Sequence, residues 1–149
     1  MKYAVLVIAL IFNCETSSGA ETKAYSTEEL RALQKQCENN DGKACSYIGR
    51  DYSKKENWVE SAKYYQKACE LENWGSCSGL GTHYSHGKGV KKDSKKAHAL
   101  FQQACDSGDV YGCFNLAGTY FDGAGVKKDV PKALELFQKV CEVNTVGCV

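Results

Sequence analysis

Residues 93–105, DSKKAHALFQQAC, return 36 positions later as residues 129–141, DVPKALELFQKVC. Asp93 and Asp129 stand where a helix N-cap belongs, because a carboxylate there accepts hydrogen bonds from the first free amides. The residues between them and the cysteines place apolar side chains at helical spacing. In the first stretch this stripe consists of Ala97, Leu100, Phe101, Ala104 and Cys105. One amphipathic helix is therefore used at least twice.

A second helical pattern follows the first. Cysteine, an aliphatic residue, a small residue and tyrosine recur in residues 45–52, 77–84 and 113–120. The small residues at 49, 81 and 117 predict that the two helices of a hairpin approach closely. The loop Gly-x-Gly-Val-x-x-Asp then occurs at 87–93 and 123–129, where Gly87 and Gly123 are expected to end the second helix in the left-handed conformation.

The cysteines fix the repeat period. Cys69, Cys105 and Cys141 lie 36 residues apart, and Cys37 precedes Cys69 by 32. A period of this size predicts an all-α superhelix, or solenoid, of stacked helical hairpins. The repeats span about 25–56, 57–92, 93–128 and 129–149, the last incomplete, and the first has a shorter connection at 53–57.

The N-terminus predicts export. Met1-Lys2-Tyr3 precedes the apolar run of residues 4–12, and a polar stretch ends in Ser18-Gly19-Ala20. This is typical of a signal peptide over residues 1–20, cleaved after Ala20, which leaves residues 21–149 as one secreted or periplasmic domain. A lipoprotein acylated at Cys14 is the alternative. No stretch is long and apolar enough to predict a membrane span.

Cleavage removes Cys14 and leaves eight cysteines, an even number that predicts disulfides in an exported chain. The spacing places each pair across a hairpin loop, within disulfide reach. The predicted pairs are Cys37 with Cys45, Cys69 with Cys77, Cys105 with Cys113, and Cys141 with Cys148. Zinc ligation is the competing interpretation, but the gap exceeds that of zinc knuckles, so no metal and no cofactor are expected.

These motifs resemble the Sel1-like repeat, a relative of the tetratricopeptide repeat, and the paired cysteines resemble the Helicobacter cysteine-rich protein family. The resemblance covers roughly residues 25–149. Two features depart from it: Ser61 replaces the usual alanine of the first helix, and the chain reaches Cys148-Val149 without a fourth second helix. The last repeat is therefore expected to expose Leu136 and Val140 and to favour self-association.

The resemblance implies binding of penicillin-like β-lactams and slow β-lactamase activity. The residues give this little support and leave open whether the chain is an enzyme. The Ser-x-x-Lys at Ser85 and Lys88 contains Gly87, which should break the helix, and Ser-Asp-Asn and Lys-Thr-Gly are missing. His83 and His86 lie at i, i+3, but surface histidines are the favoured interpretation. The catalytic residues stay unknown.

Binding is the better-supported function, because stacked hairpins form a concave face lined by their first helices. The candidate groove residues on these helices are Lys63, Gln66, Gln102 and Gln138. The expected partners are a peptide, a peptidoglycan fragment, a β-lactam or a host protein. A net charge of +1 argues against nucleic acid. Lysines beside the inter-repeat loops (88, 91, 92, 95, 96, 127, 128 and 132) form a basic rim that attracts anions or only aids solubility.

Overall fold

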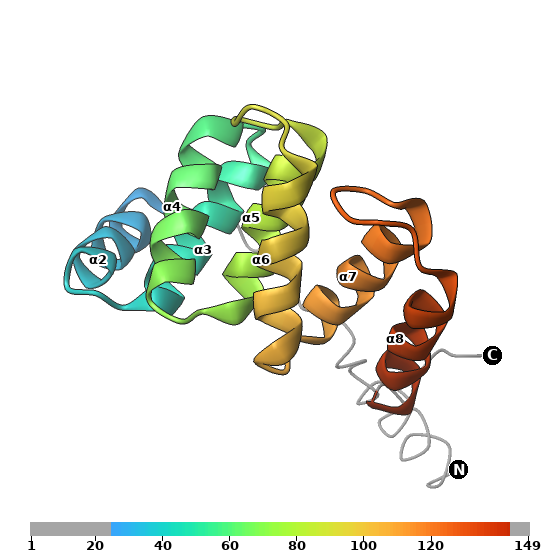
Figure 1. The fold of residues 1–149 in the computed structure, drawn as a ribbon. Helices are drawn as coiled ribbons and strands as arrows, with labels where there is room; N and C mark the ends of the chain where they lie inside the picture. The colour runs from blue at the N-terminus through green and yellow to red at the C-terminus, as the bar shows by residue number, and fades with distance from the viewer. Residues whose placement is uncertain (1–24, 144–149) are drawn as a thin grey trace, which may run out of the picture.

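The computed structural model describes residues 25–143, which form seven α-helices (Figure 1). They are α2 (Thr27–Glu38), α3 (Gly42–Lys54), α4 (Trp58–Glu70), α5 (Trp74–His86), α6 (Ser94–Asp106), α7 (Val110–Asp122) and α8 (Val130–Val143). The predicted signal peptide and Cys148 lie outside the described residues.

The helices pair as hairpins in the order α2 with α3, α4 with α5, and α6 with α7, while α8 opens the fourth repeat (Figure 1). Each helix packs mainly against its neighbours in sequence, and α5 also contacts α7. This stacking of neighbour on neighbour is the architecture of a helical solenoid. It confirms the predicted all-α superhelix.

The helix ends follow the predicted caps at Asp93, Asp129, Gly87 and Gly123, and the structure adds a cap at Asn57. The side chains of Asn57, Asp93 and Asp129 accept backbone N–H groups at the starts of α4, α6 and α8, at 3.4, 3.0 and 3.0 Å. Gly87 and Gly123 end α5 and α7 with φ values of 69° and 75°. These caps satisfy amides and carbonyls that helix ends leave without partners.

The core repeats with the sequence. Ile48, Leu80 and Leu116 occupy equivalent positions on α3, α5 and α7, and each is at most 3% exposed. The small residue that follows them lies under an aromatic ring of the next first helix. A Cβ added at Gly81 would meet the Phe101 ring at 2.6 Å, and one at Gly49 would meet the Tyr65 ring at 3.0 Å. Glycine therefore sets the helix spacing there, as predicted.

Three of the four predicted disulfides are present. Cys37–Cys45, Cys69–Cys77 and Cys105–Cys113 bridge the hairpins with Cα–Cα distances of 4.8, 4.7 and 4.4 Å. Each closes a loop of about nine residues, which corresponds to roughly 2.5 kcal/mol of loop-closure entropy in the unfolded chain. A cysteine in a disulfide has no thiolate left to bind zinc, so zinc ligation is excluded for these three pairs. Disulfides are typical of proteins that fold outside the cytoplasm. The pairing of Cys141 with Cys148 stays a prediction.

The two glycine-rich loops fold back on their own repeats. A Cβ on Gly89 would overlap the backbone of Trp58 at the start of α4, and one on Gly125 would overlap Ser94 at the start of α6. The loop after α5 is thereby fixed against α4. In repeat one, three residues suffice to connect α3 to α4, which confirms the tighter turn. None of the helices within residues 25–143 is long and apolar enough to cross a membrane.

The end of the stack differs from the expectation for Leu136 and Val140. Both are half-buried, and Leu136 packs against the cluster around Phe101 and Leu116. The exposed apolar residues nearby are Phe114 and Leu134, at 54% and 58%. The prediction failed because α7 packs against α8 and covers part of its apolar side.

Candidate functional site

The first helices of repeats two to four form what we call the A face, made of α4, α6 and α8. Gln66, Gln102 and Gln138 lie on these helices at intervals of 36 residues. Each donates its side-chain amide to an acid four residues later: Glu70 at 3.1 Å, Asp106 at 2.8 Å and Glu142 at 3.2 Å. The three predicted glutamines therefore form a ladder of identical amide–carboxylate pairs. Such pairs present fixed polar groups to a ligand.

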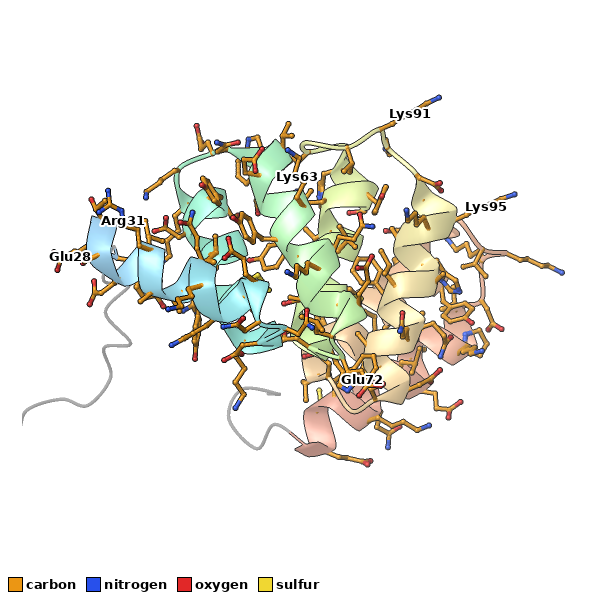
Figure 2. The ribbon with its side chains drawn as sticks, turned by 90° about the vertical axis from the view of Figure 1, so that its left-hand side faces the viewer. Glu28, Arg31, Lys63, Glu72, Lys91 and Lys95 are labelled. Carbon is orange, nitrogen blue, oxygen red and sulfur yellow. A yellow bond between two sulfur atoms is a disulfide. The ribbon has the colours of Figure 1, made fainter. Side chains whose placement is uncertain are left out.

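Lys63, the fourth predicted groove residue, lies on α4 one turn before Gln66. Its ammonium group donates to Glu60 at 2.6 Å, and this hydrogen bond raises the pKa of Lys63. The side chain is exposed, as Figure 2 shows. Because an exposed pair of this kind contributes little to stability, Lys63 remains available to a ligand.

A pocket of 230 Å³ lies between α4 and α6. Leu80, Leu100 and the disulfide cysteine Cys69 supply its apolar part, and Gln66, Glu70, Lys96 and Gln103 supply its polar part. An apolar base with a few polar groups around it is typical of a pocket that accepts one side chain of a ligand. We call it the A-face pocket. Of the predicted groove residues, the structure brings only Gln66 into it.

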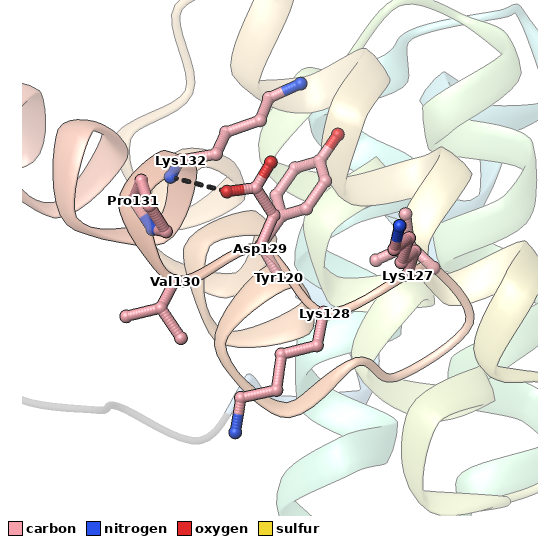
Figure 3. Close-up of a pocket in the computed structure, with 8 residues that line it drawn as sticks. Tyr120, Lys127, Lys128, Asp129, Val130, Pro131 and Lys132 are labelled. Carbon is pink, nitrogen blue, oxygen red and sulfur yellow. Dashed lines mark hydrogen bonds between the residues drawn. The ribbon is translucent and has the colours of Figure 1, made fainter.

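Two further pockets lie at the glycine-rich loops and are equivalent by the 36-residue period. One, of 470 Å³, contains Tyr84, Lys91, Lys92, Asp93 and Lys96. The other, of 510 Å³, contains their counterparts and is drawn in Figure 3. We call them the loop pockets.

Lysine and tyrosine meet in the same way in both loop pockets. The Lys96 ammonium group donates to the Tyr84 hydroxyl at 2.7 Å. A hydrogen bond to the Tyr120 hydroxyl raises the pKa of Lys132. Six of the eight lysines of the predicted basic rim therefore line two equivalent pockets, and Lys88 and Lys95 lie outside them.

A fourth pocket, of 310 Å³, is lined by the ends of α3, α4 and α5. Its residues are Ser53, Trp58, Tyr65, Gly79, Thr82, His83 and Lys88. The Lys88 ammonium group lies 4.4 Å from the centroid of the Trp58 ring, a cation–π arrangement. Burial raises the pKa of Tyr65. We call this cavity the Tyr65 pocket.

Ser61 and His83, which also lines the Tyr65 pocket, form a buried polar pair. His83 is 5% exposed, so the expectation that it lies on the surface was wrong. Its Nδ1 donates to the Lys88 carbonyl at 2.7 Å, and its Nε2 lies 3.1 Å from the Ser61 hydroxyl. Ser61 also donates to the Gly49 carbonyl at 2.8 Å. Burial lowers the pKa of His83 and outweighs the hydrogen bond to Lys88, which raises it.

This chain of contacts resembles a nucleophile with an oriented base, but its position argues against catalysis. Ser61 is 0% exposed, so a substrate carbonyl cannot reach its hydroxyl. The hydroxyl has one hydrogen and two acceptors within reach, at Gly49 and His83. The pair is therefore better explained as a structural link between α3, α4 and α5.

Ser85 does not form a catalytic pair either. Gly87 ends α5 in the left-handed conformation, as predicted, and Lys88 lies on the Trp58 ring. The Ser85 hydroxyl donates to the Thr82 carbonyl at 2.9 Å, and His86 Nδ1 lies 2.8 Å from that hydroxyl and 3.0 Å from the same carbonyl. The Ser85 hydroxyl is therefore bonded within its own helix rather than to Lys88. Within residues 25–143, His, Cys, Asp and Glu form no group of three that could hold a metal.

The sequence did not identify the other residues of the A-face pocket. Leu80 and Leu100 belong to apolar stripes, which indicate a core rather than a pocket. Glu70 stands beside Cys69 at the end of α4, where it carries no motif of its own. The signal that could have found it is the period: an acid follows Gln66, Gln102 and Gln138 by four positions in each repeat.

Comparison with known proteins agrees with this architecture. The Sel1 repeat model matches residues 37–73, 75–109 and 110–143. A search of curated proteins found no match. Helicobacter pylori cysteine rich protein B is 32% identical, with a TM-score of 0.61 over 78% of this chain and 86% of that one.

Two other solved structures are similar over 78% of this chain. A Sel1 repeat protein from Oxalobacter formigenes is 25% identical with a TM-score of 0.72. A protective antigen present in uropathogenic Escherichia coli strains, which displays an SLR fold, is 28% identical with a TM-score of 0.73. The chain spans 48% and 26% of these two proteins. Repeats of this type generally bind other proteins. With three matched repeats, the chain belongs to the Sel1 repeat family.

Proposed function

We propose that this protein is an exported, non-enzymatic scaffold that binds an extended peptide segment of another protein along its A face. The observation that carries the proposal is the A-face pocket, which lies beside the first pair of the glutamine ladder. An apolar side chain of the peptide enters between Leu80 and Leu100. Side-chain amides and carboxylates at a fixed interval then hydrogen-bond to its backbone.

The test is a selection of random dodecapeptides displayed on phage against the oxidised protein, followed by affinity measurements on synthetic peptides. Gln103→Trp places a large ring over the A-face pocket from an exposed position and should abolish binding. Gln36→Trp makes the same change on α2, outside the pocket, and should leave binding intact. Equal binding by both variants, or no selected peptide, would refute the proposal.

Export is part of the proposal. The disulfides support an oxidising compartment, and residues 1–20 supply the expected signal peptide. N-terminal sequencing of the protein recovered from periplasm or medium should begin at Glu21. A first residue at Cys14 would instead establish the lipoprotein alternative. A peptidoglycan fragment or a host protein would engage the same face, and both belong in the binding screen.

The β-lactam activity implied by the family is a second candidate. The observation that favours it is the Ser61–His83 pair with its orienting carbonyl at Lys88, and the burial of Ser61 counts against it. A chromogenic β-lactam should be offered to the oxidised protein, to a reduced and alkylated sample, and to Ser61→Ala. Turnover that needs both the fold and Ser61 would establish this candidate; turnover unchanged in Ser61→Ala would exclude Ser61.

A further inference from the structure

The segments that flank the A-face helices carry opposite charges: the loops before α6 and α8 are basic, and the hairpin turns after α4 and α6 are acidic. Residues 86–96 and 122–132, at the loop end, hold eight lysines and three acids. Residues 67–75 and 103–111, at the hairpin end, hold four acids and one lysine. In Figure 2, Lys91 and Lys95 lie at the end where α6 begins, and Glu72 lies at the opposite end, beyond α4. The A face is thus positive along one edge and negative along the other.

At α6 and α8 this arrangement opposes the preference of the helices themselves, whereas α4, with Glu60 in its first turn and Lys67 in its last, follows that preference. A helix N-terminus favours negative side chains, and a C-terminus favours positive ones. The first turns of α6 and α8 instead hold lysines and no acid, and their ends hold Asp106 and Glu142. Only the N-caps Asp93 and Asp129 follow the rule. Charges placed against the local preference weaken the helices, which indicates that they serve something outside the helix.

Lys96 connects this edge to the A-face pocket. It lines that pocket together with Gln66 and Leu100, and it also lines the loop pocket around Tyr84. A chain that leaves the A-face pocket toward the loop end therefore passes directly over Lys92 and Lys91. In the opposite direction it passes Glu70, which lines the same pocket.

From this continuity we infer that the bound peptide is acidic on one side of its apolar anchor, and that its acidic flank lies over the loop pockets. The inference rests on the proposed function, because it assumes that a peptide occupies the A-face pocket. The lysines then orient the peptide along the helices and accelerate its association, as complementary charges do at protein interfaces. A peptide with a basic flank on that side meets like charge and binds less tightly.

The experiment uses one apolar core from the phage selection, synthesised with three aspartates, three serines or three lysines on either side. Affinity for the oxidised protein is measured by fluorescence anisotropy at 20 and 200 mM salt. The aspartate form in one of the two orientations should bind about tenfold more tightly than the serine form at low salt. Most of that advantage should disappear at high salt, because salt screens exposed charges.

The double variant Lys91→Glu and Lys92→Glu should remove the preference for the aspartate flank and leave the serine form bound as before. Lys35→Glu with Lys43→Glu makes the same change in net charge on exposed lysines of hairpin one, and should preserve the preference. Equal affinity for all three flanks would overturn this inference while leaving the peptide scaffold intact. Failure of every form to bind would overturn the scaffold proposal and the inference with it.

Discussion

Helix α4 packs against both α3 and α5, and α6 packs against both α5 and α7, yet the two junctions use different side chains. At the first, the Tyr65 ring lies against Gly49 and Gly79 and beside a pocket. At the second, the Phe101 ring lies against Gly81, and the Asn115 amide donates to the Ser78 hydroxyl across α5 and α7. Both junctions therefore share a contact between an aromatic ring of the first helix and a glycine of the second helix. The side chains around that contact differ between the two repeats.

The buried polar groups show the same freedom. In repeat two, Ser61 of the first helix meets His83 of the second at 3.1 Å. In repeat three, His98 of the first helix meets Thr119 of the second at 2.8 Å, so the imidazole and the hydroxyl have exchanged helices. Every buried side-chain nitrogen or oxygen within residues 25–143 has a hydrogen-bond partner. The residues thus differ between the repeats, but each buried polar group keeps a hydrogen-bond partner, because a buried group without one lowers the stability of the fold.

The largest expected effect comes from the disulfides that flank these junctions. Cys69→Ala with Cys77→Ala, and Cys105→Ala with Cys113→Ala, each open a loop of the same size, worth about 2.5 kcal/mol. Cys77 is 0% exposed and Cys69 is 8% exposed, whereas Cys105 and Cys113 are half-buried. The first double variant should therefore lose more free energy of unfolding in urea. Equal losses would mean that burial of the sulfur atoms adds nothing.

The second-largest effect on stability is expected from the buried pair of Ser61 and His83. Ser61→Ala removes the hydrogen-bond partner of His83 Nε2 and should lower the free energy of unfolding by about 2 kcal/mol. Ser85→Ala is the control, because it deletes the same hydroxyl beside a histidine on the more exposed part of α5, and should change stability by less than about 0.5 kcal/mol. If both variants unfold alike, the contrast between a buried and a surface pair is wrong.

Replacing glycines of the second helices by alanine is expected to cause smaller changes in the free energy of unfolding. Gly81→Ala gains about 1 kcal/mol of helix propensity but forces a Cβ to within 2.6 Å of the Phe101 ring, so a net loss of about 1 to 2 kcal/mol is expected. Gly49→Ala should be close to neutral, because its Cβ would meet Tyr65 at 3.0 Å. Gly118→Ala meets nothing within 4 Å and should stabilise. Thermal unfolding of the three variants tests this order.

The smallest effect is a pH dependence. Burial lowers the pKa of both His83 and His98, with Lys132 adding to the shift at His98. The unfolded chain therefore binds protons more readily than the folded one. Stability should be full above the ordinary histidine pKa of about 6.5 and should fall as the pH drops below it. His98→Asn should reduce the slope of unfolding free energy between pH 7 and pH 5; an unchanged slope would remove His98 from the explanation.

The sequence predicted the regular part of this molecule well, because period, caps, cysteines and glycines are local signals. Asp93, Gly87 and the spacing of Cys69 and Cys77 each act over one turn or one hairpin, and their roles were confirmed. The Sel1 architecture follows from repeating them.

The junctions could not be predicted in the same way. Ser61 and His83 are 22 residues apart and meet only because α4 and α5 pack in one particular register. His83 was expected on the surface, near the end of its helix, but α5 contacts α4, α6 and α7 and buries more than one of its faces. The A-face pocket likewise arises between two repeats, where no single motif describes it.

Each bridge joins cysteines eight positions apart, and each glycine-rich loop closes on its own repeat. The eight cysteines of residues 21–149 allow 105 complete pairings, yet the three pairings described all join consecutive cysteines. A chain that enters an oxidising compartment from its N-terminus can therefore complete one hairpin before the next one arrives. In the exported chain that we propose, the order in which the cysteines emerge can select the correct partners, which a chain with distant pairs leaves to an isomerase.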